Sequence, residues 1–103
     1  MRREPASCAD MAELRAEIDR LDAEIVGLLD ARRGYIARAA EIKRAAGLPA
    51  RIGERVEEVV ARVRAEAAAR DLDPALVEAL WRRLIDWSIA LEERALSAEG
   101  KDP

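Results

Sequence analysis

Apolar residues recur at alternating spacings of three and four over the first half of the chain. The series consists of Met11, Leu14, Ile18, Leu21, Ile25 and Leu28, and its register continues through Arg32, Tyr35, Ala39 and Ile42. This spacing keeps one face of a helix apolar and forms a heptad seam. Ser7 or Asp10 is a suitable N-cap, and Gly47 followed by Pro49 ends the helix. The pattern predicts a helix over residues 11–46.

Two further helices are predicted downstream. Over residues 54–70 a helical stripe is formed by Val56, Val59, Val60, Val63 and Ala67. Asp73 as N-cap and Pro74 as the first helical residue begin a third helix, which ends near Leu96. Its apolar residues are too many for one stripe, so we expect burial on more than one side. The fold class is all-α with three helices in one domain over 10–97, between tails 1–9 and 98–103.

The first predicted helix is too long for a monomer of this size. It would extend about 54 Å, whereas a compact chain of this length has a radius of gyration of about 13 Å. Part of its apolar seam would therefore lie bare. A second copy of the chain is the simplest cover, so we predict an intertwined homodimer.

Composition then narrows the chemistry. The 103 residues carry a net charge of −3, with one cysteine, Cys8, and no histidine. This excludes the usual zinc sites and histidine-based triads, and no glycine cluster offers a phosphate-binding loop. We therefore expect no metal and no cofactor, and the acidic balance argues against nucleic acid. With no signal-like start and no long apolar run, we expect no membrane association and a cytoplasmic location.

Several polar residues stand near the seam. Arg32 interrupts it, and Lys43 follows about 20° from the same face and about 16 Å further along. Arg15 points about 100° away from Arg32, so it would reach such a pocket only from a partner chain. Arg55 begins the second helix, and Ser88 and Glu92 lie one turn apart on the third. These cations suggest a ligand with carboxylates or phosphate.

A plainer interpretation stays open for each residue taken singly. Most arginines are solvated or form surface ion pairs. A buried Arg32 would also fix the register of a dimer, and Glu92 beside Glu93 fits a solvated acidic face.

The combined pattern resembles the all-helical (AroQ-class) chorismate mutases, a family that includes the isochorismate–pyruvate lyases of salicylate biosynthesis. The resemblance covers about residues 8–96. It is carried by the run Leu14-Arg15-x-x-Ile18-Asp19-x-Leu21-Asp22-x-x-Ile25-Val26-x-Leu28-Leu29-x-x-Arg32-x-x-Tyr35, by Lys43, Pro49 and Arg55, and by Ile85-x-x-Ser88-x-x-x-Glu92.

The resemblance implies a role for each matching residue. Arg15 would enter the partner's site and bind a substrate carboxylate, and Arg32 would hold a carboxylate within its own chain. Lys43 would donate to the ether oxygen of the enolpyruvyl group, and Arg55 would complete the clamp. Ser88 would contact the ring side. Glu92 would face the ether oxygen opposite Lys43, which makes Lys43, Glu92 and Arg32 the catalytic residues.

Two departures from the family pattern affect this assignment. Ile52 stands where the family often has an aspartate that holds the ring hydroxyl, and Glu92 stands where it often has glutamine. The implied activity is chorismate mutase, which feeds aromatic amino acid biosynthesis. Isochorismate–pyruvate lyase, which serves salicylate biosynthesis, and a non-catalytic helical dimer module are the alternatives. The substrate in either enzyme is a small dicarboxylate, chorismate or isochorismate.

Overall fold

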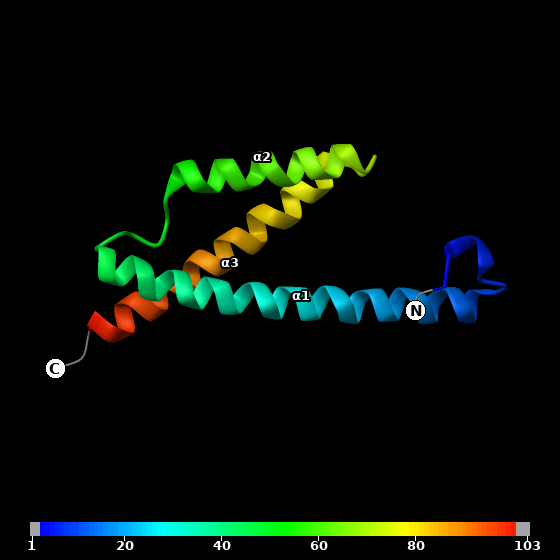
Figure 1. Ribbon diagram of the computed structural model, residues 1–103, viewed down its shortest axis with the longest axis horizontal. Coiled ribbons are helices and arrows are strands. Elements are labelled where there is room, and N and C mark those ends of the chain that lie inside the picture. Colours follow the sequence, from blue (N-terminus) through cyan, green and yellow to red (C-terminus); the bar gives the residue numbers. More distant parts are fainter. Residues whose placement is uncertain (1–2, 101–103) are drawn as a thin grey trace. The chain divides into compact units, whose positions relative to one another are not determined.

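The computed structural model describes the backbone of residues 3–100 and the side chains of residues 3–97, and the secondary structure of this part consists of helices without strands (Figure 1). The elements are a short 3-10 helix η1 (Pro5–Ser7) and the α-helices α1 (Met11–Ala46), α2 (Gly53–Ala69) and α3 (Pro74–Gly100). The predicted all-α class with three helices is confirmed. The helix predicted to end near Leu96 continues to Gly100, and residues 101–103 of the predicted C-terminal tail lie outside the described residues.

Both ends of α1 are capped as its sequence indicates. Asp10 Oδ1 accepts the backbone N–H of Glu13 at 2.9 Å. At the other end Gly47 has a φ of 69°, and the N–H of Leu48 donates to the carbonyl of Lys43 at 2.8 Å. This is a Schellman ending, which requires a left-handed residue and therefore favours glycine.

The turn between α2 and α3 has the same Schellman geometry, with an aspartate in place of the glycine. Asp71 has a φ of 58°, and the N–H of Leu72 donates to the carbonyl of Ala67 at 2.9 Å. Asp73 then caps α3 as predicted, with Oδ1 accepting the N–H of Ala75 at 2.9 Å.

The chain consists of two compact units, residues 1–34 and 35–103. In the first unit the segment before α1 folds back along the first turns of that helix (Figure 1). In the second unit α2 packs against α3, to which a tight turn joins it. Its core consists of Ala50, Val60, Ile85 and Ile89, with Val56, Val59, Trp81 and Leu96 packed against them.

Only one side of α3 is buried within the chain. Val77, Ile85 and Ile89 are buried, whereas Leu80 and Trp87 are 57% and 48% exposed. The expectation of burial on more than one side is therefore wrong for the single chain. The physical reason is that α2 covers one side only, which leaves the other apolar side for a further surface.

Arg82 of α3 holds α2 and α3 together at their outer surface. Its guanidinium contacts both carboxylate oxygens of Glu57 on α2, at 3.0 and 3.1 Å, and its Nε donates to Glu78 at 2.7 Å. Hydrogen bonds from Arg82 lower the pKa of both glutamates, and the two carboxylates in turn raise the pKa of Arg82. Arg64 on α2 completes the network through Glu78 at 2.7 Å.

The network predicts a pH-dependent share of stability. Both carboxyl groups have a lower pKa in the folded chain than their ordinary value of 4.5. The stability that their ionised forms contribute is therefore complete above pH 4.5 and is lost as the pH falls toward the pKa values of the folded chain. Arg82→Ala should lower Tm by a few degrees at pH 7 and by less near pH 3. Arg83→Ala, at the exposed neighbouring position, is the control and should have little effect at either pH. An equal loss from Arg82→Ala at both pH values would assign the effect to packing of its aliphatic stem.

Candidate functional site

A lysine and a glutamate from different helices meet in the second unit. Lys43 lies in the last turn of α1 and Glu92 in the second half of α3. Lys43 Nζ is 2.8 Å from Glu92 Oε1, and the side chains are only 19% and 5% exposed. A charged pair this shielded from water is costly unless its partners compensate it, so the pair is a candidate site rather than a surface feature.

The geometry of the pair leaves bonding capacity for a ligand. Lys43 Nζ donates its hydrogen bond to the carbonyl oxygen of Ala50, at 2.6 Å. Glu92 Oε1 is buried and makes no hydrogen bond within the described part of the chain, so its contact with Lys43 is an ion pair. The ammonium carries three donors, and the two contacts leave at least one for a bound acceptor.

Ser88 lies one turn before Glu92 on the same buried side of α3. It is 2% exposed, and its hydroxyl donates to the carbonyl of Leu84 at 2.8 Å. Four of the predicted site residues, Lys43, Arg55, Ser88 and Glu92, thus lie in the second unit, and Ser88 and Glu92 are buried there.

The two residues at the start of α2 do not join this contact. The Arg55 guanidinium pairs with Glu58 on its own helix at 2.7 Å, and both side chains are more than half exposed. Ile52 precedes α2 in an extended conformation and contributes no side-chain hydrogen bond to the helix end. The role of Arg55 at a ligand stays a prediction.

Arg15 and Arg32 belong to the first unit. Arg15 is exposed and makes no hydrogen bond or ion pair with the residues that the structure describes, whereas Arg32 is partly buried. Their roles at a ligand stay predictions.

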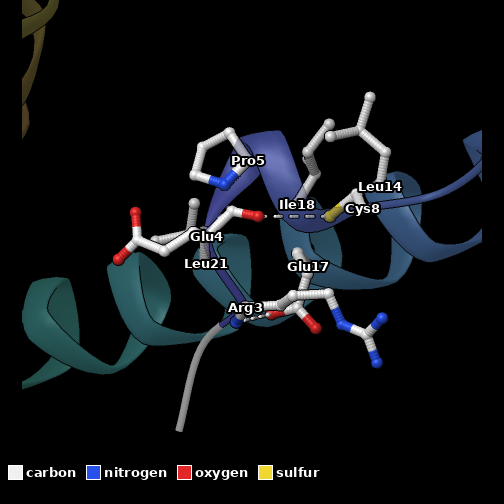
Figure 2. Close-up of a pocket in the computed structure, with 8 residues that line it drawn as sticks. All are labelled: Arg3, Glu4, Pro5, Cys8, Leu14, Glu17, Ile18 and Leu21. Atoms are coloured by element: carbon white, nitrogen blue, oxygen red, sulfur yellow. Dashed lines mark hydrogen bonds between the residues drawn. The ribbon is translucent and has the colours of Figure 1, made fainter.

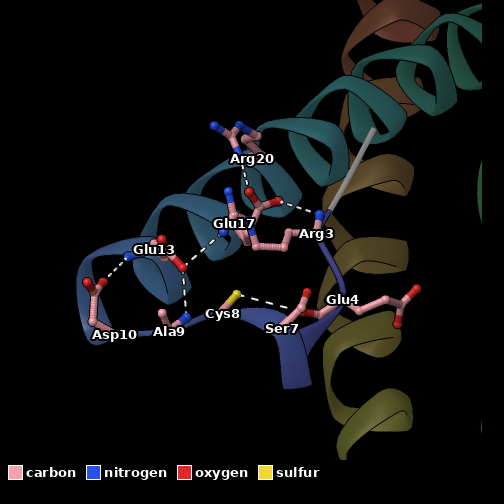
Figure 3. Close-up of polar contacts among 9 residues, drawn as sticks. All are labelled: Arg3, Glu4, Ser7, Cys8, Ala9, Asp10, Glu13, Glu17 and Arg20. Carbon is pink, nitrogen blue, oxygen red and sulfur yellow. Dashed lines mark hydrogen bonds and ion pairs between the residues drawn. The ribbon is translucent and has the colours of Figure 1, made fainter.

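The N-terminal segment, predicted as a tail over 1–9, is bound to α1 (Figure 3). Glu13 Oε2 accepts the N–H of Ala9 at 2.7 Å and pairs with the Arg3 guanidinium at 3.0 Å. Glu17 accepts the Arg3 N–H at 3.2 Å and also pairs with Arg20. Burial raises the pKa of Glu17, but these hydrogen bonds outweigh burial and hold it below its ordinary value. The Asp10-x-x-Glu13 capping pattern is the sequence signal for this fold-back.

A pocket of about 310 Å³ lies between this segment and α1 (Figure 2). It is lined by Arg3, Glu4, Pro5, Cys8, Leu14, Glu17, Ile18 and Leu21. Two carboxylates against one guanidinium make this pocket a poor receptor for a dicarboxylate. Lys43 is therefore a better candidate than this pocket for binding an anionic ligand.

The described residues form neither a cluster of metal ligands nor a membrane-spanning helix. No three histidine, cysteine or carboxylate side chains come together there as metal ligands. No helix in that part of the chain is both long and apolar enough to cross a bilayer.

The family follows from comparison with known sequences. A family model described as chorismate mutase type II matches residues 14–93, most of the chain. The chain therefore belongs to the type II chorismate mutase family, and it is an enzyme of that family.

Three relatives cover over four-fifths of the chain. An isochorismate pyruvate lyase of Pseudomonas aeruginosa is 36% identical over 87 residues, which are 84% of each chain. The T-protein of Enterobacter agglomerans is 34% identical, and a bifunctional chorismate mutase/prephenate dehydratase of Aquifex aeolicus is 33% identical, over 82% of this chain in each case. This chain spans only 22% and 24% of those two proteins.

Proposed function

We propose that the chain rearranges chorismate to prephenate in a cationic pocket built around Lys43. The buried contact between Lys43 Nζ and Glu92 carries the proposal, because it brings an ammonium donor and a carboxyl group together in a site shielded from water. A pericyclic rearrangement needs no nucleophile. It needs its dicarboxylate substrate held in a compact conformation and its growing negative charge stabilised.

Lys43 supplies the main electrostatic stabilisation in this proposal. The ether oxygen becomes more negative as its bond to the ring breaks, and an ammonium held in a site of low water content stabilises that charge strongly. Arg32 and Arg55 hold substrate carboxylates through paired N–H donors. Ser88 bounds the ring side of the pocket.

In this proposal Glu92 has to be protonated before it can stabilise the ether oxygen of the substrate. An ionised carboxylate only accepts hydrogen bonds, so it would repel a negative ether oxygen. In the free chain Glu92 Oε1 lies 2.8 Å from the Lys43 ammonium. A bound dicarboxylate competes for that ammonium and adds negative charge nearby. Substrate binding therefore favours a protonated Glu92, which then donates to the ether oxygen.

A homodimer completes the proposed site. The apolar face of α1 includes large side chains that are more than half exposed in the single chain: Met11, Ile25, Leu28, Tyr35 and Ile42. A second copy would cover this face and bring Arg15 of one protomer to the site of the other.

Isochorismate–pyruvate lyase is the second candidate, and a specific observation favours it. The relative of that name is 36% identical to this chain, compared with 34% and 33% for the other two relatives. Both reactions break the ether bond of an enolpyruvyl dicarboxylate. The same Lys43 donor would therefore serve either one, in salicylate or in aromatic amino acid biosynthesis.

The reaction is tested by giving the purified protein each substrate separately. Prephenate from chorismate is the expected product, and salicylate plus pyruvate from isochorismate would establish the second candidate. Lys43→Ala should lower kcat/KM about 100-fold or more, as the loss of a donor to a developing charge does. Arg38→Ala, a surface residue paired with Glu41 on the same helix, is the control. Absence of both products would favour a non-catalytic dimer module.

The pH profile tests the protonation of Glu92. Activity should rise as the pH falls from 8, until substrate ionisation or folding is lost, because more Glu92 carries a proton. Glu92→Gln should flatten the profile and keep activity near neutral pH, since an amide donates at any pH. Glu93→Gln at the exposed neighbouring position should leave the profile unchanged. Superimposable profiles of the wild type and Glu92→Gln would remove Glu92 from the reaction.

Shared sites predict recovery of activity between two inactive variants. When Arg15→Ala and Lys43→Ala protomers exchange at random, half the dimers carry one site with both lesions and one intact site. The mixture should regain about a quarter of the wild-type activity. Sedimentation should give twice the chain mass of 11.4 kDa. No recovery after proven exchange would place Arg15 in the site of its own chain.

A further inference from the structure

The connection between α1 and α2 carries a buried residue at its centre. Ala50 is 6% exposed, whereas Leu48 two residues earlier is 46% exposed and Arg51 directly after it is exposed. The methyl group of Ala50 belongs to the same core cluster as Val60 of α2 and Ile85 and Ile89 of α3. The connection is thus anchored to both helices at this one residue.

The carbonyl group of the same residue holds the ammonium of the proposed site. Lys43 Nζ lies 2.6 Å from the Ala50 oxygen and 2.8 Å from Glu92 Oε1. Ile89 and Glu92 lie three residues apart on α3, so they share one side of that helix. The two oxygen atoms that contact the ammonium are therefore positioned against the same helix.

The uncharged Ala50 carbonyl can hold the Lys43 ammonium at any protonation state of the site, whereas the Glu92 carboxylate cannot. A lysine side chain is flexible, and a donor that acts in a transition state must already have lost that rotamer freedom. When Glu92 takes up a proton, its attraction for the ammonium falls. The Ala50 carbonyl does not titrate and continues to hold Lys43 in place.

We propose that Ala50 is a positioning residue of this site, whose buried methyl group anchors the connection and whose carbonyl oxygen keeps the Lys43 ammonium aimed at the ligand. The role depends on the size of the side chain as well as on the backbone. Glycine at position 50 removes the anchor and frees the connection, and a larger side chain overfills the core and displaces the carbonyl. The inference rests on the proposed function for its kinetic consequence but not for the contact itself.

A double-mutant cycle separates positioning from stability. Ala50→Gly should lower kcat/KM about tenfold, mainly through kcat, and should have almost no further effect in a Lys43→Ala background. Ala67→Gly, at a buried alanine of α2 that is 3% exposed, is the matched control. It should lower Tm by a comparable amount and leave kcat/KM within about twofold of the wild type. An equal kinetic loss from Ala50→Gly in both backgrounds would overturn the proposal.

A spectroscopic readout tests the contact without turnover. The chain has two lysines, Lys43 and Lys101, so ¹⁵N-labelled lysine gives two ammonium signals. The Lys43 signal should be sharpened by slow proton exchange in the wild type and broadened in Ala50→Gly, with Lys101 as internal reference. An unchanged Lys43 signal would contradict the positioning role. If neither chorismate nor isochorismate reacts, the proposed function fails, and this readout still decides the role of Ala50.

A backbone substitution serves if Ala50→Gly does not fold. The α-hydroxy analogue of Arg51, introduced by chemical synthesis, turns the Ala50 carbonyl into an ester, which is a weaker acceptor, and keeps the methyl group. It should broaden the Lys43 signal in the same way. A signal as sharp as that of the wild type would show that the carbonyl does not hold the ammonium.

Discussion

The site depends on the buried contact between the Lys43 ammonium and the Glu92 carboxylate. Removing two charges from water costs several kcal/mol per ion, and the attraction between them rarely returns a surplus. Two apolar side chains of similar size would serve the fold at least as well. The proposed function gives the pair a purpose: an incoming dicarboxylate would compete for the ammonium, and the carboxylate would then take up a proton.

The fold supports this contact by fixing three short stretches of backbone. The Schellman ending at Gly47 stops α1 just after Lys43, and Ala50 ties the following connection into the core. The packing of α2 on α3, held at its outer surface by Arg82 and Glu57, keeps Glu92 on the buried side of α3. What the single chain lacks is cover for the apolar faces of α1 and α3, and that cover is what a second copy would supply.

Local rules of helix formation made most of the fold predictable from sequence. The spacing of Met11 to Ile42, the glycine at position 47 and the Asp73-Pro74 pair placed the helices to within a few residues, because periodicity and capping act over one or two turns.

The side of α3 that stays exposed was not predictable, since it depends on which surfaces a single chain brings together. The hydrogen bond from the N–H of Arg3 to Glu17, fourteen residues away, was not predictable for a similar reason. Within the site, Ser88 and Glu92 were recognisable by resemblance. Ala50 was not, because it acts through a backbone carbonyl, and any residue carries one.

Proton uptake on ligand binding tests the central claim most directly. An unreactive cyclic dicarboxylate of the substrate's shape is titrated by calorimetry at neutral pH in two buffers of different ionisation enthalpy. If binding converts the Lys43–Glu92 ion pair into a protonated donor, the wild type takes up about one proton per site and Glu92→Gln takes up none. Equal uptake by the two proteins, or none by the wild type, would contradict the account.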